Sequence, residues 1–104
     1  MSKIISITAL ASVSPLGHES KTIWENYKNK KHCFTSRFLD HKNTLVASLN
    51  EDSNRLTDHI QQSDSKYKSL DKSVLFAMVA SRKALQNSGW KTTDVFGINL
   101  GSSR

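Results

Sequence analysis

The sequence predicts an α/β protein whose strands and helices follow one another in a βαβ-type segment. Two runs rich in β-branched and apolar residues, 3–13 and 95–101, predict strands, and two helical patterns lie between them. Strand, helix, excursion, helix and strand is the order of a crossover that joins two parallel strands with a right-handed connection. With 104 residues, the chain has the length of one small domain.

The first predicted strand, residues 3–13, places Ile4, Ile5 and Ile7 among small polar residues, as expected of a strand buried on both faces. It ends at Pro15 and Gly17. Proline removes a backbone donor and glycine permits a tight turn, so we expect the chain to leave the sheet here.

A helix is expected next, with Ser20 as its cap and its end near Lys31. Ile23, Trp24 and Tyr27 fall on one side of this helix and form its apolar face. The rest of the helix surface is mostly lysine and asparagine.

The middle of the chain carries a weaker signal. Phe34, Phe38 and Leu39 predict a few anchoring contacts, and residues 45–49 predict a short strand. Residues 50–69 are polar, and we expect a flexible excursion there.

The second predicted helix has Asp71 or Ser69 as its cap and ends at Ser88, with Gly89 in the left-handed position that follows a helix. Residues 74–80 are apolar on every side, so this helix should be buried almost all round. The final strand, 95–101, follows it.

Two strands and a helix of this kind do not complete a parallel sheet, which needs several strands between helices on both faces. We therefore expect residues 1–104 to be an incomplete part of a larger domain. By itself this chain should fold poorly or aggregate.

The net charge of the chain indicates which partners it could bind, and its N-terminal segment indicates where in the cell it is found. Fifteen lysines and arginines against nine acids give a formal net charge of +6. This balance favours a nucleic acid, an anionic surface or an acidic protein as a partner, unless acidic residues elsewhere in a larger protein offset it. The N-terminal apolar run is too short for a signal peptide or a membrane span, so we expect a cytoplasmic protein with no membrane partner.

Several residues invite a chemical role, but the pattern around each favours a simpler interpretation. Cys33 is the single cysteine, so it forms no disulfide within the chain, and it lacks a strand-to-helix elbow and an oriented base. His32 and His41 could be imagined as its base, but histidines in a polar loop are mostly solvated. No zinc-ligand spacing joins the four histidines His18, His32, His41 and His59.

Glycines, aromatic residues and lysines elsewhere in the chain also have a simpler interpretation than a chemical role. Gly97, Gly101 and Ser102–Ser103 indicate a turn after a strand, because a phosphate-binding loop needs more glycine and a Lys-Ser/Thr pair. Trp24 and Tyr27 indicate a core-facing stripe rather than a base-stacking surface. Lys28, Lys30 and Lys31 form a solvated helix end that could also steer an acidic carrier protein. No catalytic, cofactor-binding or metal-binding residue is assigned.

Three blocks, in order, resemble the beta-ketoacyl synthase family. Residues 7–17, ITALASVSPLG, are similar to its opening strand and turn, and Trp24 falls where its first helix has a comparable apolar residue. Residues 71–89 resemble the helix before its second strand, and residues 96–104 resemble that strand and turn. Ala9 and Ala11 depart from the glycines usual there, and a methyl group crowds a close backbone approach.

The resemblance implies a partial thiolase-like fold of layered α/β/α/β/α architecture, in which residues 1–104 are the first part of the N-terminal domain. It also implies an acyltransferase that condenses acyl thioesters with loss of carbon dioxide, in fatty-acid or polyketide-type biosynthesis. The family uses a cysteine at a helix N-terminus with two histidines, or a histidine and an asparagine, and these residues lie beyond Arg104 in family order. This chain alone is therefore expected to be inactive.

The partners that the resemblance implies are acyl carrier protein and a second subunit in a homodimer or heterodimer, with no nucleic acid and no cofactor. Two alternatives stay open. One is a non-catalytic partner similar to chain-length-determining subunits, and the other is a small basic module that binds nucleic acid or an acidic protein.

Overall fold

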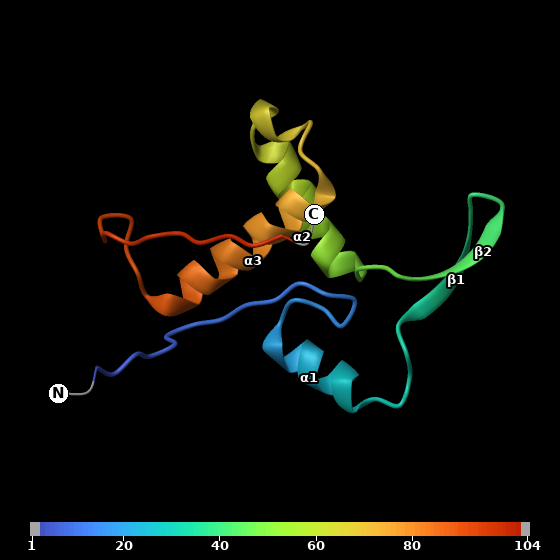
Figure 1. Ribbon diagram of the computed structural model, residues 1–104, viewed down its shortest axis with the longest axis horizontal. Coiled ribbons are helices and arrows are strands. Elements are labelled where there is room, and N and C mark those ends of the chain that lie inside the picture. The colour runs from blue at the N-terminus through green and yellow to red at the C-terminus, as the bar shows by residue number, and fades with distance from the viewer. Residues whose placement is uncertain (1–2, 103–104) are drawn as a thin grey trace.

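The structure is a computed structural model that describes residues 3–102 (Figure 1). Helices and one antiparallel sheet make up its regular elements, so the predicted α/β class is confirmed. In chain order these elements are α1 (Ser20–Lys28), β1 (Phe34–Leu39), β2 (Lys42–Ala47), α2 (Glu51–Ser63), the short 3-10 helix η1 (Ser65–Tyr67) and α3 (Lys72–Ser88).

The two strands expected at 3–13 and 95–101 are wrong as strands, because within residues 3–102 neither segment pairs with a sheet. In Figure 1 both segments run from left to right, and α3 runs from right to left. The two segments are therefore parallel and the helix between them is antiparallel to both, as in a parallel crossover. The pairing is missing because a strand buried on both faces needs neighbours at its edges. Ile5 is instead 92% exposed.

The turn after the first segment is confirmed. Ser14 and Gly17 form an isolated antiparallel bridge, in which Gly17 N donates to Ser14 O at 2.8 Å. The predicted cap of the next helix is wrong: Glu19 holds the N-cap position, without a side-chain hydrogen bond, and Ser20 is already helical. The helix also ends earlier than expected, at Lys28, because Asn29 adopts an extended backbone.

Strands β1 and β2 form a hairpin with a two-residue loop, Asp40 and His41, whose φ angles are 47° and 64°. Positive φ at both loop residues is the backbone of the tight turn that suits the twist of a hairpin. The strand expected at 45–49 is thus part of β2, shifted toward the N-terminus. The contacts expected of Phe34, Phe38 and Leu39 are wrong, since all three side chains are exposed.

The excursion expected at 50–69 is helical over most of its length, so that expectation is wrong. Asn50 caps α2 by accepting a hydrogen bond from Ser53 N at 2.9 Å, and Glu51 and Asp52 suit the positive end of the helix dipole. Ser53, Thr57 and Ile60 recur at helical spacing and are the buried residues of α2.

Helix α3 has the predicted ends. Asp71, the first of the two candidate caps, accepts from Lys72 N at 2.9 Å, and Gly89 has φ 76°. The prediction that α3 is buried almost all round is wrong, because its described neighbours cover only one face. That face supplies Leu75 and Val79, which with Ile60 of α2 form the core.

Candidate functional site

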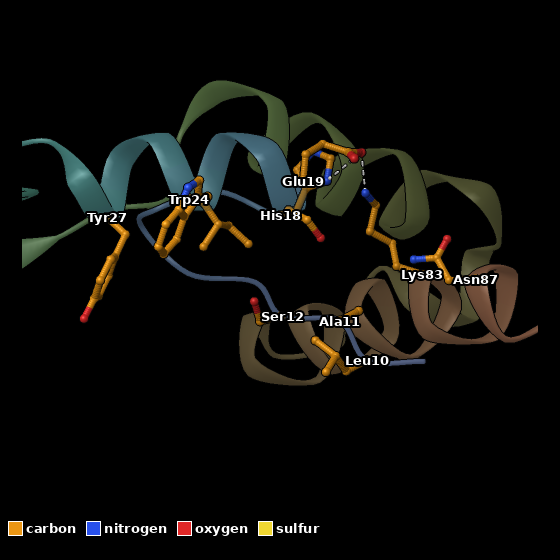
Figure 2. A pocket seen from close by; sticks show the side chains of 11 residues that line it. Leu10, Ala11, Ser12, His18, Glu19, Trp24, Tyr27, Lys83 and Asn87 are labelled. Carbon is orange, nitrogen blue, oxygen red and sulfur yellow. Dashed lines mark hydrogen bonds and ion pairs between the residues drawn. The ribbon is translucent and has the colours of Figure 1, made fainter. Parts of the chain in front are cut away.

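A pocket with a volume of about 370 Å³ lies between α1, the C-terminal half of α3 and the segment 10–12 (Figure 2). The turn at 14–17 reverses the chain, so that α1 lies beside the segment that leads into the turn. Eleven residues line the pocket: Leu10, Ala11, Ser12, His18, Glu19, Ser20, Ile23, Trp24, Tyr27, Lys83 and Asn87.

One end of the pocket is polar and joins α1 to α3. Lys83 Nζ donates a hydrogen bond to Glu19 Oε1 and forms an ion pair with it, as the dashed line in Figure 2 shows. That hydrogen bond, together with the charge of Lys83, lowers the pKa of Glu19 below its usual value. Because the Glu19 side chain is largely exposed, solvent screens the pair, which therefore positions the two helices more than it stabilises them.

His18 is the most enclosed titratable group at this end, with its side chain 11% exposed. Its Nδ1 lies 3.4 Å from Glu19 Oε1 but makes no hydrogen bond within residues 3–102. A buried ring nitrogen with no hydrogen bond loses solvation without a full replacement. The imidazole can therefore accept or donate a hydrogen bond to a group that enters the pocket.

The other end of the pocket is aromatic. Trp24 and Tyr27 stack with their ring centroids 6.0 Å apart, and Lys28 Nζ lies 5.5 Å from the Trp24 ring. Both rings are exposed, so the expectation of a core-facing stripe is wrong for this chain. The apolar face of α1 is formed as predicted, but it borders the pocket instead of packing into the core.

The pocket has the groups for binding but not those for covalent catalysis. Its hydroxyls, on Ser12, Ser20 and Tyr27, have no hydrogen bond to His18 among the described residues, so no nucleophile is paired with a base. No cluster of three metal-binding side chains occurs in residues 3–102. An amphipathic group could place its polar end near His18 and Lys83 and its apolar end against Trp24.

The structure does not bring the cysteine and the histidines of the chain together into one site. Cys33 is a free, half-buried thiol in the loop between α1 and β1, and His32 beside it packs against Phe34. His41 sits in the hairpin turn and His59 on the exposed side of α2. Nothing in the described part of the chain pairs Cys33 with an oriented base, and no catalytic residue is assigned.

The C-terminal glycines and the lysine cluster both lie in exposed parts of the structure. Gly97 and Gly101 lie in the exposed segment after α3, and neither has a positive φ. Lys28, Lys30 and Lys31 are exposed at the end of α1. No pattern in the sequence indicates the contact between Glu19 and Lys83, because these residues are far apart in the chain and one caps α1 while the other lies in α3.

In a comparison with known protein families, residues 2–103 match the family model described as "Beta-ketoacyl synthase, N-terminal domain". Neither the curated proteins nor the solved structures contained a match to the chain. A search of the described residues for a helix long and apolar enough to cross a membrane found none.

Proposed function

This chain belongs to the beta-ketoacyl synthase family, and on that premise we propose that it is a scaffold segment of a synthase that condenses acyl thioesters with loss of carbon dioxide. The partial thiolase-like α/β fold predicted from the sequence agrees with this membership. In the proposed reaction, an enzyme thiolate attacks one acyl thioester, takes its acyl group and releases the carrier thiol. A second, carboxylated thioester then loses carbon dioxide, and the resulting enolate attacks the acyl carbon, which breaks the bond to the enzyme sulfur and releases the enzyme thiolate.

The observation that carries the proposal is the extent of the family match, which spans nearly the whole chain. The described elements support a scaffold role. Helix α3 exposes apolar residues such as Val74 and Leu85, and a helix of this kind needs further protein against it. Residues 3–102 pair no nucleophile with a base, which fits a segment that supports a site formed elsewhere.

Acyl carrier protein is the proposed carrier of the thioesters, and a second subunit in a homodimer or heterodimer is the proposed assembly, in the cytoplasm. The net charge of +6 supports the first of these, because a basic surface attracts an acidic carrier. The pathway, fatty-acid or polyketide-type, follows from the thioesters that the enzyme accepts.

The test is a condensation assay with the full-length protein. Malonyl-acyl carrier protein and an acyl-acyl carrier protein are supplied, carbon dioxide release is measured, and the 3-ketoacyl product is identified by mass spectrometry. We expect both products from the full-length protein and neither from the 104-residue chain. A folded full-length protein that releases no carbon dioxide would favour a non-catalytic partner subunit instead.

A substitution of Cys33 tests whether this segment supplies the nucleophile of the reaction. Cys33→Ala should leave carbon dioxide release within about twofold of the wild type, because the loop that holds Cys33 has no oriented base to activate the thiol. Loss of activity in that variant, with its fold unchanged, would contradict the scaffold role.

A further inference from the structure

Another cavity, of about 260 Å³, lies between α2 and α3, which cross each other in Figure 1. We call it the α2–α3 groove. Its floor is apolar and consists of Leu56 and Ile60 from α2 and Val79 from α3. Ile60 and Val79 are only 5% and 3% exposed and belong to the core, so the packing of the two helices fixes this floor. The groove can therefore cover the apolar part of a small molecule.

The edge of the α2–α3 groove is polar and basic. His59 of α2 lies there, with Arg82, Lys83 and Gln86 of α3. The three α3 residues follow Val79 at spacings of three, four and seven, so they share with it one side of the helix. None of the described residues that line the groove is acidic. This edge therefore favours a group that accepts hydrogen bonds and carries negative charge.

Arg82 supplies the positive charge that no acid neutralises. Within residues 3–102, Arg82 forms no ion pair, and its residue is exposed. The neighbouring cations differ, since Arg55 of α2 pairs with Asp52 at 3.1 Å and Lys83 pairs with Glu19. The planar guanidinium of arginine presents N–H donors that fit the two oxygens of a carboxylate.

The charge balance at this edge selects a monoanion. Lys83 is already paired with Glu19, so, with His59 counted as neutral, Arg82 alone leaves one uncompensated positive charge. A phosphate monoester would bring nearly two negative charges close to the carboxylate of Glu19, which would repel it. A neutral molecule would leave the charge of Arg82 unmatched. A carboxylate on a compact apolar body satisfies both the cation and the apolar floor.

We propose that the α2–α3 groove binds a small organic carboxylate. The carboxylate pairs with Arg82, and the apolar body lies over Leu56 and Val79. Lys83 lines this groove as well as the pocket beside α1, so Glu19 and the bound carboxylate share one ammonium group. The two carboxylates repel each other, and binding is therefore coupled to the contact between α1 and α3.

The first test titrates the full-length protein with benzoate in a calorimeter. Two related molecules each lack one part of the recognition: benzamide has the ring without the charge, and acetate has the charge without the ring. We expect each of them to bind at least about tenfold more weakly than benzoate. Hydrogen exchange followed by mass spectrometry locates the site, since benzoate should slow exchange in peptides that cover α2 and α3.

The second test uses three variants. Arg82→Gln should weaken benzoate binding at least about tenfold, because it removes the cation that pairs with the carboxylate. The matched control Arg55→Gln removes the same charge from α2 outside the groove and should change the affinity by less than about twofold. Glu19→Gln should strengthen binding by about two- to fivefold, because Lys83 then has no competing carboxylate. Circular dichroism checks that each variant keeps its fold.

Four results would overturn the inference. They are an equal loss of affinity in Arg82→Gln and Arg55→Gln, benzamide that binds as tightly as benzoate, phenyl phosphate that binds more tightly than benzoate, and benzoate protection that appears elsewhere in the protein but not in α2 or α3. A condensation assay on the same protein tests the proposed function separately, because the groove is inferred from contacts that do not depend on that reaction.

Discussion

Gly17 is the residue at which three parts of the chain meet. Its φ is 120°, a backbone conformation that side-chain-bearing residues rarely adopt. A Cβ atom there would lie 3.2 Å from Cγ2 of Thr22 in α1 and 3.3 Å from Nδ2 of Asn50, the cap of α2. The turn that the sequence predicts therefore also sets how closely the starts of two helices approach.

The substitution Gly17→Ala should lower the free energy of unfolding of the full-length protein by about 1–3 kcal/mol, because strain in the backbone adds to the crowding. Urea unfolding followed by tryptophan fluorescence measures this change. The matched control is Gly97→Ala, since no atom lies within 4 Å of a Cβ built at Gly97. Its effect should stay within about 0.5 kcal/mol. Equal effects in the two variants would contradict the account of the turn.

The ion pair between Glu19 and Lys83 predicts a pH dependence. Because the pKa of Glu19 is lowered in the folded state, first by the hydrogen bond from Lys83, the pair stabilises the α1–α3 contact above the ordinary pKa of a glutamate. That contribution is lost as pH falls through the lowered pKa, in the window below about pH 4.3. The protection factors of the α1 amides, which correct exchange for its intrinsic pH dependence, should fall in that window in the wild type. In Glu19→Gln the exchange should not change there beyond the general effect of pH.

The sequence predicts the backbone conformation of single residues better than it predicts contacts between residues that are far apart in the chain. The turn glycines Gly17 and Gly89 are found as expected, because their conformations follow from neighbouring residues. The pair Glu19–Lys83 could not be predicted, since the contact depends on how α1 and α3 lie relative to each other. The burial of His18, whose side chain is 11% exposed, depends on the same arrangement.

Among the elements, α2 shows why a polar helix is easily missed. Two of its three buried residues are Ser53 and Thr57, so its inward face carries little hydrophobic signal. The signals that were present are local: Asn50 as a cap, two acids in the first turn, and Arg55 one turn after Glu51 and Asp52. Helix α3 was easier to predict because Asp71 and Gly89 mark both ends and its apolar run is long.

Removing each of the two buried hydroxyls of α2 should change the free energy of unfolding in opposite directions. Ser53 Oγ is fully buried and has no hydrogen-bond partner in the described part of the chain, so Ser53→Ala should raise the free energy of unfolding by about 1 kcal/mol. Thr57 Oγ1 donates to Ser53 O at 2.9 Å, so Thr57→Val should lower it by a similar amount, about 1 kcal/mol. Thermal unfolding of the two variants measures both changes. A stability loss in Ser53→Ala would show that its hydroxyl is satisfied.

At the scale of the whole molecule, the chain is extended. Its radius of gyration is 16.8 Å, against roughly 13 Å expected for a compact domain of this length. The buried apolar core contains only Ile60, Leu75 and Val79 among the described residues. The sequence predicts the α/β class and predicts that these residues do not complete a sheet. It does not predict the hairpin β1–β2, because β1 lacks the alternating pattern that marks a strand in sequence.

The exposed apolar segments predict how the isolated chain behaves. Ile4, Ile7, Ile98 and Leu100 are mostly exposed on backbone that pairs with no sheet in the described structure, and such edges promote association. We expect the isolated 104-residue chain to self-associate, to bind a hydrophobic dye and to melt over a broad range. Light scattering after size exclusion, with calorimetry, measures this. A monomer with a sharp, cooperative transition would contradict it.

Under the proposed function, this chain supports the reaction of a beta-ketoacyl synthase without supplying its nucleophile. Acyl-enzyme mapping tests this proposal most directly: the full-length protein is incubated with an acyl thioester, digested, and searched by mass spectrometry for the acylated residue. We predict a single acylated cysteine other than Cys33, with Cys33 unmodified. Acylation of Cys33, or a folded protein that takes up no acyl group, would contradict the claim.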